Sequence, residues 1–158
     1  MEHKPATSSI YPYAIMLLSR REHSKAELKQ KLVRRFGAEA LLTIEETLAR
    51  LAQDNYQSDE RFTESFITSR LQRGYGLNRI KLELRQKGIN QEGINQMTQD
   101  NSIQEQEHIQ LERMWRKKFN TQPKTSQERY QQQCHLAKKG FRKEVIEQFF
   151  RSPIWDEH

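Results

Sequence analysis

The segment LRQKGINQEGI at residues 84–94 decides the fold class, because its pattern returns 52 residues later as LAKKGFRKEVI. Six positions match in residue type between the two copies. They are Leu84, Lys87, Gly88, Ile89, Glu92 and Ile94 in the first copy and Leu136, Lys139, Gly140, Phe141, Glu144 and Ile146 in the second. The same offset aligns Leu28 with Ile80, and Leu32 with Leu84. A period near 50 residues predicts tandem supersecondary units.

Helix boundaries can be read around this repeat. Four Ser/Thr–Glu pairs have the spacing of a capping box, in which the hydroxyl accepts from the third helical amide. They are Ser24–Glu27, Thr43–Glu46, Ser102–Glu105 and Thr125–Glu128. Glycines that can adopt the left-handed conformation predict helix ends at Gly37, Gly74, Gly88 and Gly140. No segment alternates with a period of two, so we predict an all-α chain of about nine helices.

Apolar residues at helical spacing predict the buried face of each helix. The predicted stripes are Leu28, Leu32 and Phe36; Ile44, Leu48 and Leu51; Phe62, Phe66 and Ile67; Ile80 and Leu84; Leu111, Met114, Trp115 and Phe119; Tyr130, Cys134 and Ala137; and Val145, Ile146, Phe149 and Phe150. Such narrow stripes predict three tandem three-helix bundles, at residues 9–54, 55–100 and 101–154. Three bundles in a row would form an elongated body that could be curved, which suits an extended partner.

The composition agrees with small modules. Of the 158 residues, 34% are hydrophobic and 30% are charged, so one large core is not expected. The apolar run Tyr11–Leu18 is shorter than the roughly 20 residues that cross a bilayer. Arg20 and Arg21 follow it where a signal peptide would have its cleavage site. Cys134 is the only cysteine, so no intrachain disulfide can form. We expect a cytoplasmic protein, a monomer, without membrane contact.

The sequence contains no recognisable pattern of catalytic or metal-binding residues. The five histidines include no pair spaced three or four residues apart for zinc. Gly74-Tyr75-Gly76 begins like a dinucleotide-binding loop, but Arg79 stands where the third glycine belongs. We interpret Cys134 as a buried packing residue rather than a nucleophile. We therefore expect no enzyme activity, cofactor or metal.

Charged residues alternate in blocks along the chain. The net charge is +6, from 27 Lys and Arg against 21 Asp and Glu. Three basic blocks, each followed by an acidic one, lie at residues 20–36, 61–90 and 113–143. They are either solvated helix faces or one basic surface per module, facing a polyanion or an acidic protein. Tyr56, Tyr75 and Trp155 lie near predicted helix ends and could stack on bases or on a partner.

The central module carries a family resemblance. It contains YQSDERF at residues 56–62, FITSR at 66–70, GYGLNRI at 74–80 and ELRQKGI at 83–89. These segments closely resemble the motifs of the RecX family of bacterial recombinase regulators. Leu77 departs from the family pattern, which usually has proline there, and Gln57 replaces a common leucine.

The resemblance implies a function. RecX-like proteins are tandem three-helix repeats that bind the RecA–single-stranded-DNA filament. They inhibit its ATP hydrolysis, strand exchange and co-protease function, and so act in DNA repair, recombination and the SOS response. Some also bind DNA directly, so we expect single-stranded DNA as a partner, with double-stranded DNA as a further candidate. The alternative is a sequence-independent DNA-binding protein built from basic three-helix modules, which the basic blocks alone do not separate from a recombinase regulator.

The candidate contacts to recombinase or DNA are all basic. In module two they are Arg61, Arg70, Arg73, Arg79, Arg85 and Lys87; in module one Arg20, Arg21, Lys25, Arg34 and Arg35; and in module three Arg116, Lys117, Lys118, Lys138, Lys139, Arg142 and Lys143. The alternative interpretation is that Arg61 and Arg70 pair with acids on helix faces and only solubilise the protein.

Three of these residues are expected at one corner. Arg70 and Arg73 lie one helical turn apart, and the glycine turn brings Arg79 back toward them. Glu83 is the only acidic residue between Glu64 and Glu92, so we expect little charge compensation there. Replacing all three arginines by alanine should then leave melting unchanged or slightly improved, and should weaken recombinase inhibition about tenfold or more.

Overall fold

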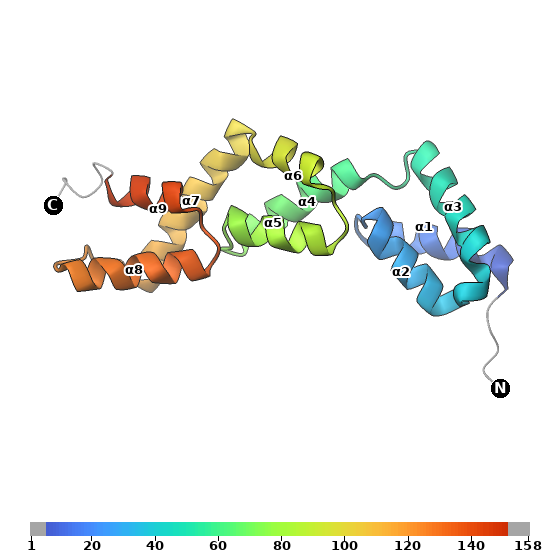
Figure 1. Ribbon diagram of the computed structural model, residues 1–158, viewed down its shortest axis with the longest axis horizontal. Coiled ribbons are helices and arrows are strands. Elements are labelled where there is room, and N and C mark those ends of the chain that lie inside the picture. The colour runs from blue at the N-terminus through green and yellow to red at the C-terminus, as the bar shows by residue number, and fades with distance from the viewer. Residues whose placement is uncertain (1–5, 152–158) are drawn as a thin grey trace. The chain divides into compact units, whose positions relative to one another are not determined.

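The computed structural model describes residues 6–151. All regular secondary structure in this part of the chain is helical (Figure 1). The α-helices are α1 (Ile10–Arg20), α2 (Lys25–Phe36), α3 (Leu41–Gln53), α4 (Asp59–Gln72), α5 (Leu77–Gln86), α6 (Gln91–Thr98), α7 (Asn101–Lys118), α8 (Ser126–Lys138) and α9 (Lys143–Phe150), with the short 3₁₀ helices η1 (Thr7–Ser9) and η2 (Ala38–Ala40). The predicted all-α class is confirmed. Within residues 6–151, no helix has the length and apolar character needed to span a membrane. Trp155 lies outside the described residues.

The helices form three-helix modules, α1–α3, α4–α6 and α7–α9. By contacts, however, the chain divides into two compact units. Unit 1 holds the described residues up to Ser65 together with Arg85–Asn90. Unit 2 holds Phe66–Leu84 and the described residues from Gln91 onward. The turn after α5 therefore belongs with the first helices of the chain rather than with its own module.

The core of unit 1 confirms the first predicted stripes. Leu28, Leu32 and Phe36 of α2 are buried, as are Ile44, Leu48 and Leu51 of α3, and Ile10, Ala14 and Leu17 of α1 join them. The α2 helix begins where the sequence predicts, because Ser24 Oγ accepts a hydrogen bond from the Glu27 amide at 3.1 Å. One small core thus forms from the three apolar stripes of the first three α-helices.

Two of the four predicted caps are correct. Besides Ser24, Thr125 caps its helix by accepting from the Glu128 amide at 3.1 Å. The prediction for Thr43 is wrong, because α3 begins two residues earlier, directly after η2. The prediction for Ser102 is also wrong, because the carboxylate of Asp100 accepts from the Ser102 amide at 2.8 Å and caps α7.

The predicted buried face of α8 is wrong. Tyr130 is 67% exposed and Cys134 only half-buried, so neither is a core residue. The helix instead buries Leu136 and the polar Gln132. Gln132 is held by the indole of Trp115, whose Nε1 donates to its Oε1 at 2.8 Å. This hydrogen bond satisfies the buried amide, and the Tyr130 side of α8 lies at the surface.

The 52-residue repeat corresponds to a repeated contact. In unit 1, Ser24 Oγ donates to the carbonyl of Lys87 at 2.7 Å. In unit 2, the amide of Gly76 donates to the carbonyl of Lys139 at 2.9 Å. Both donors and both acceptors are 52 residues apart. A Lys-Gly turn of one module therefore packs on the start of the middle helix of the preceding module, which explains why Arg85–Asn90 belongs to unit 1.

Glycine is required at these turns. Gly88 and Gly140 have φ angles of +83° and +94°, in the left-handed region. A Cβ at Gly88 would lie 2.5 Å from the Cβ of Ala26, and a Cβ at Gly140 would lie 2.3 Å from the Cβ of Arg79. The turn therefore approaches the helix more closely than any side chain would permit.

Candidate polyanion-binding surface

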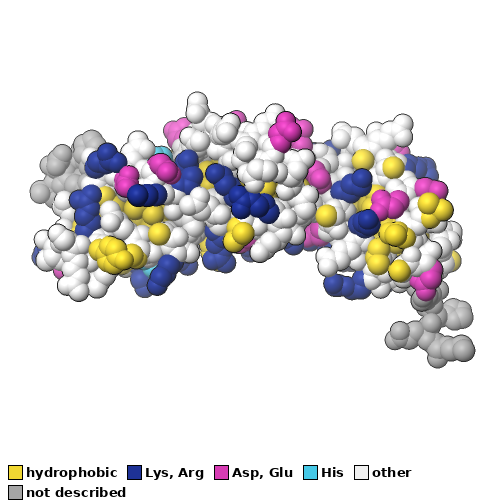
Figure 2. Space-filling model, viewed as in Figure 1, with side chains coloured by type: hydrophobic (Ala, Val, Ile, Leu, Met, Phe, Trp, Pro, Cys, Tyr) yellow, Lys and Arg dark blue, Asp and Glu magenta, His cyan; other side chains and the backbone are white. Residues whose placement is uncertain are grey.

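The turn after α8 brings two predicted sets of basic residues together in unit 2. Besides the contact at Gly76, the amide of Asn78 donates to the carbonyl of Gly140 at 2.9 Å. Residues around the start of α5 thus lie beside residues at the end of α8. We define the composite basic surface as Arg73, Arg79, Lys138 and Lys139. Lys and Arg side chains lie at the molecular surface over α5, α8 and α9 (Figure 2).

Tyr75 holds two of these cations. The guanidinium carbon of Arg79 lies 4.1 Å from the centre of the Tyr75 ring, and Lys139 Nζ lies 5.7 Å from it. Cation–π contacts of this kind orient both side chains around one aromatic ring. Two residues that are 60 positions apart in the sequence therefore form one positively charged group.

Glu83 lies at the centre of the predicted arginine corner. Its carboxylate lies 2.9 Å from Arg70 Nε and 3.1 Å from Arg79 Nε. The expectation of little charge compensation is therefore wrong for these two arginines. The alternative interpretation, in which Arg70 pairs with an acid on a helix face, describes Arg70 better. Arg73 is exposed and forms no ion pair with the described residues. It is the member of the corner whose charge is available to a ligand.

Arg142 has a different environment from the other predicted basic residues. Its Nε donates to Glu107 Oε1 at 2.7 Å, and its side chain is only 19% exposed. Glu107 is fully buried, and its other oxygen accepts from the Leu77 amide at 2.8 Å. Because Leu77 is not a proline, α5 begins with an N–H group that Glu107 satisfies. The position of Glu107 on the apolar face of α7, four residues before Leu111, was the only sequence signal for this site.

Unit 1 contains a second charged cluster. Glu27 accepts hydrogen bonds from Arg21 Nη1 at 2.8 Å and from Lys87 Nζ at 2.9 Å. Burial alone would raise the pKa of Glu27, but the hydrogen bonds from the two cations outweigh it and lower the pKa to about 2. Arg61 also has an acidic partner, because its Nε donates to Glu22 Oε1 at 3.0 Å. These three predicted residues stabilise unit 1 and present partly compensated charge.

The other predicted residues lie at separate positions. Arg116 pairs with Glu112 at 2.9 Å, Lys143 lies 3.9 Å from Glu147, and Arg35 stacks on Tyr13. The exposed remainder comprises Arg20, Lys25, Arg34, Arg85, Lys117 and Lys118. Within the composite basic surface, the structure brings Arg79 and Lys139, from different predicted modules, to the one ring of Tyr75.

The helices of residues 6–151 follow one another as three-helix modules, which is the architecture of a helical repeat protein. The family model described as "RecX, second three-helix domain" matches residues 58–97. The regulatory protein RecX of Haemophilus influenzae (strain PittEE) is 39% identical over 142 residues, which cover 86% of this chain and 89% of that protein. The regulatory protein RecX of Pseudomonas entomophila (strain L48) is 40% identical over 134 residues, which cover 84% of this chain and 84% of that protein.

The RecX of Mannheimia succiniciproducens is 50% identical, but over 91 residues that cover 58% of its own length. Among solved structures, the crystal structure of RecX from Lactobacillus salivarius has a TM-score of 0.74. It matches 92% of this chain and 94% of its own, at 20% identity, and shows the same fold. The chain belongs to the RecX family.

Proposed function

We propose that this protein regulates RecA by binding the RecA–single-stranded-DNA filament and inhibiting its ATP hydrolysis, strand exchange and co-protease activity. The proposal includes a cytoplasmic monomer that has no catalytic activity of its own. It also includes direct contacts to DNA, single-stranded and, as a further candidate, double-stranded. Family membership supports the regulatory role, and the composite basic surface carries the contact to the filament.

The composite basic surface has the chemistry that a DNA-containing filament requires. Arg73 and Lys138 are exposed and form no ion pair with described residues, so binding a phosphate or carboxylate would not break an internal pair. Arg79 is oriented by Tyr75 and by Glu83, which reduces the conformational freedom that binding would cost. Charge-assisted hydrogen bonds from such groups contribute about 1.5–3 kcal/mol each.

The decisive experiment measures the ATPase activity of the cognate RecA on single-stranded DNA while this protein is added. Inhibition is expected at fewer than one protein per RecA, because a bound regulator that blocks filament growth affects many protomers. Inhibition that needs one protein per RecA would indicate sequestration of RecA instead. Unchanged ATPase in the presence of measurable DNA binding would favour the alternative, a sequence-independent DNA-binding protein.

A pair of charge variants tests the surface itself. The double change Arg73→Gln, Lys138→Gln removes two charges from the composite basic surface and breaks no ion pair among the described residues. It should weaken inhibition about tenfold or more. The control Arg50→Gln, Lys124→Gln removes two charges elsewhere and should inhibit as the unmodified protein does. Equal inhibition by both variants would place the contact on another surface.

A further inference from the structure

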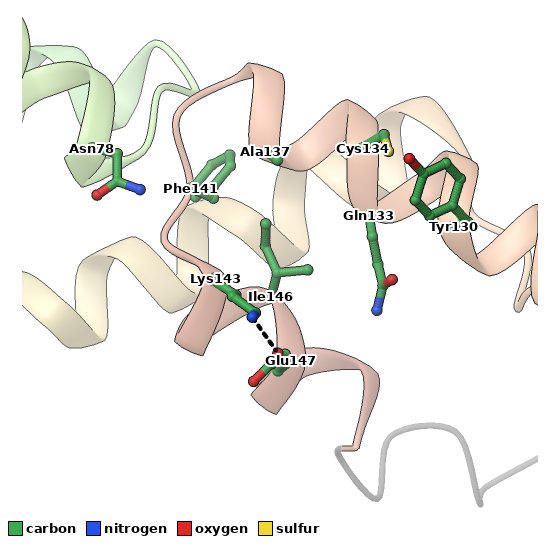
Figure 3. A pocket seen from close by; sticks show the side chains of 9 residues that line it. All are labelled: Asn78, Tyr130, Gln133, Cys134, Ala137, Phe141, Lys143, Ile146 and Glu147. Carbon is green, nitrogen blue, oxygen red and sulfur yellow. Dashed lines mark ion pairs between the residues drawn. The ribbon is translucent and has the colours of Figure 1, made fainter.

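A pocket of about 360 Å³ opens between α8 and α9 in unit 2. Its apolar wall comprises Tyr130, Cys134, Phe141 and Ile146 (Figure 3). This is the face of α8 that the apolar spacing predicts to be buried, and the structure leaves it open. None of the functional assignments made above uses it.

Tyr130 supplies an exposed aromatic ring at this pocket. It is 67% exposed. The hydroxyl end points toward Cys134, so the ring lies along the pocket wall (Figure 3). An exposed aromatic ring offers a face on which a planar ligand can stack.

Two side-chain amides line the pocket, Gln133 on the side of Tyr130 and Asn78 at the opposite end (Figure 3). Asn78 lines the pocket from the start of α5, and Gln133 lines it from α8. Neither forms a side-chain hydrogen bond within residues 6–151. An amide presents both donors and an acceptor, which is the pattern that pairs with the edge of a nucleobase.

The rim of the pocket carries positive charge. Lys143 lines the pocket with a side chain that is 84% exposed. Arg129 and Lys138 are exposed beside the lining residues Tyr130 and Ala137 on α8. The acidic lining residue, Glu147, lies 3.9 Å from Lys143 and 3.4 Å from Arg151. Its negative charge is therefore compensated by two cations. An acidic peptide would use this charge but would leave the free amides and the stacking face without a role.

We propose that this pocket binds one unstacked base of single-stranded DNA. Tyr130 stacks on the base, Gln133 contacts its edge, and Lys143 contacts the adjacent phosphate. The inference rests on the proposed function, because it assigns a DNA contact to the third module of a filament-binding protein.

The first test compares two fluorescent oligonucleotides of equal length, oligo(dT) and a fully abasic strand, by anisotropy. Both carry the same phosphates, so only the first can fill the pocket with a base. Stacking on one aromatic side chain corresponds to about a five-fold or larger preference for oligo(dT). Tyr130→Ala and Gln133→Ala should lose that preference. Tyr56→Ala, which removes another exposed tyrosine, should keep it. Equal binding of both strands to the unmodified protein would overturn the proposal.

The second test uses Cys134 as a reporter, since it is the only cysteine in the chain. Oligo(dT) should slow the reaction of its thiol with a disulfide reagent, and the abasic strand should not. Protection by a Trp-containing poly-glutamate peptide, but not by oligo(dT), would overturn the proposal and assign the pocket to a protein segment. The RecA ATPase assay is separate from both tests. Inhibition without base preference therefore refutes the pocket alone, and base preference without inhibition refutes the proposed function alone.

Discussion

The fully buried carboxylate of Glu107 accepts a hydrogen bond from Arg142 Nε at 2.7 Å, across 35 residues of sequence. Arg142 precedes α9, and Glu107 lies within α7. The second carboxylate oxygen holds the Leu77 amide at the start of α5. One side chain thus fixes the two turns that carry the composite basic surface.

Replacing Arg142 by alanine should destabilise unit 2 strongly. Removing one partner of a buried ion pair leaves an uncompensated charge, at a cost of about 3–5 kcal/mol. Urea denaturation followed by the fluorescence of Trp115, which lies in the core of unit 2, would measure the loss. The neighbouring change Lys143→Ala is the control, because that side chain is 84% exposed and should change stability by less than about 0.5 kcal/mol. Similar effects of the two variants would show that Arg142 is not a structural residue.

Removing all three corner arginines should now reduce stability, contrary to the expectation from sequence. Glu83 Oε2 is buried and lies against Arg70, and its other oxygen pairs with Arg79. Arg70→Ala, Arg73→Ala, Arg79→Ala would leave this carboxylate without a cation, at a cost of about 1–2 kcal/mol. Thermal melting by circular dichroism measures the change.

Two further variants separate charge from structure at this corner. Arg73→Ala alone should melt as the unmodified protein does, and adding Glu83→Gln to the triple variant should restore part of its loss. If the triple variant melts unchanged, the two ion pairs of Glu83 contribute nothing measurable in solution.

The sequence predicts the helices and the repeat but not every buried face. The stripe Tyr130–Cys134–Ala137 has correct helical spacing, yet α8 buries the polar Gln132 instead. Apolar periodicity cannot find a buried amide, because its burial depends on the donor Trp115 on another helix. With Gln132 and Leu136 buried, the Tyr130 side of α8 lies at the surface and lines the pocket.

The sequence also predicts basic residues without showing which of them are already paired. The repeat aligns Lys87 with Lys139, but the first pairs with the buried Glu27 and the second lies near the ring of Tyr75. Positions that are equivalent in the repeat therefore differ in available charge. The partner in each case lies on a distant segment, which no local pattern shows.

The pH dependence of unit 1 should follow Glu27. Its pKa falls from 4.5 to about 2 on folding, so its charged form stabilises the folded state above about pH 4.5. This contribution disappears as the pH falls from about 4.5 to about 2. Its size at neutral pH is on the order of 3 kcal/mol.

The comparison with Glu27→Gln isolates this carboxylate from His23, whose own pKa is lowered by burial. The free energies of unfolding of the two proteins, from urea denaturation followed by NMR signals of unit 1, should differ most near pH 7 and converge near pH 2. A difference that is constant across this range would mean that Glu27 titrates normally in the folded protein.

Affinity for single-stranded DNA should be weak and should depend steeply on salt. Each phosphate that a cation neutralises contributes about 0.7 to the slope of log affinity against log salt concentration. Arg73→Gln, Lys138→Gln should therefore lower the slope by about 1.4, while Arg50→Gln, Lys124→Gln should leave it unchanged. Tyr130→Ala should lower affinity at every salt concentration without changing the slope, because stacking releases no counterions. Titrations at four or more salt concentrations measure both quantities, and an affinity that does not respond to salt would refute the contact of the composite basic surface with phosphate.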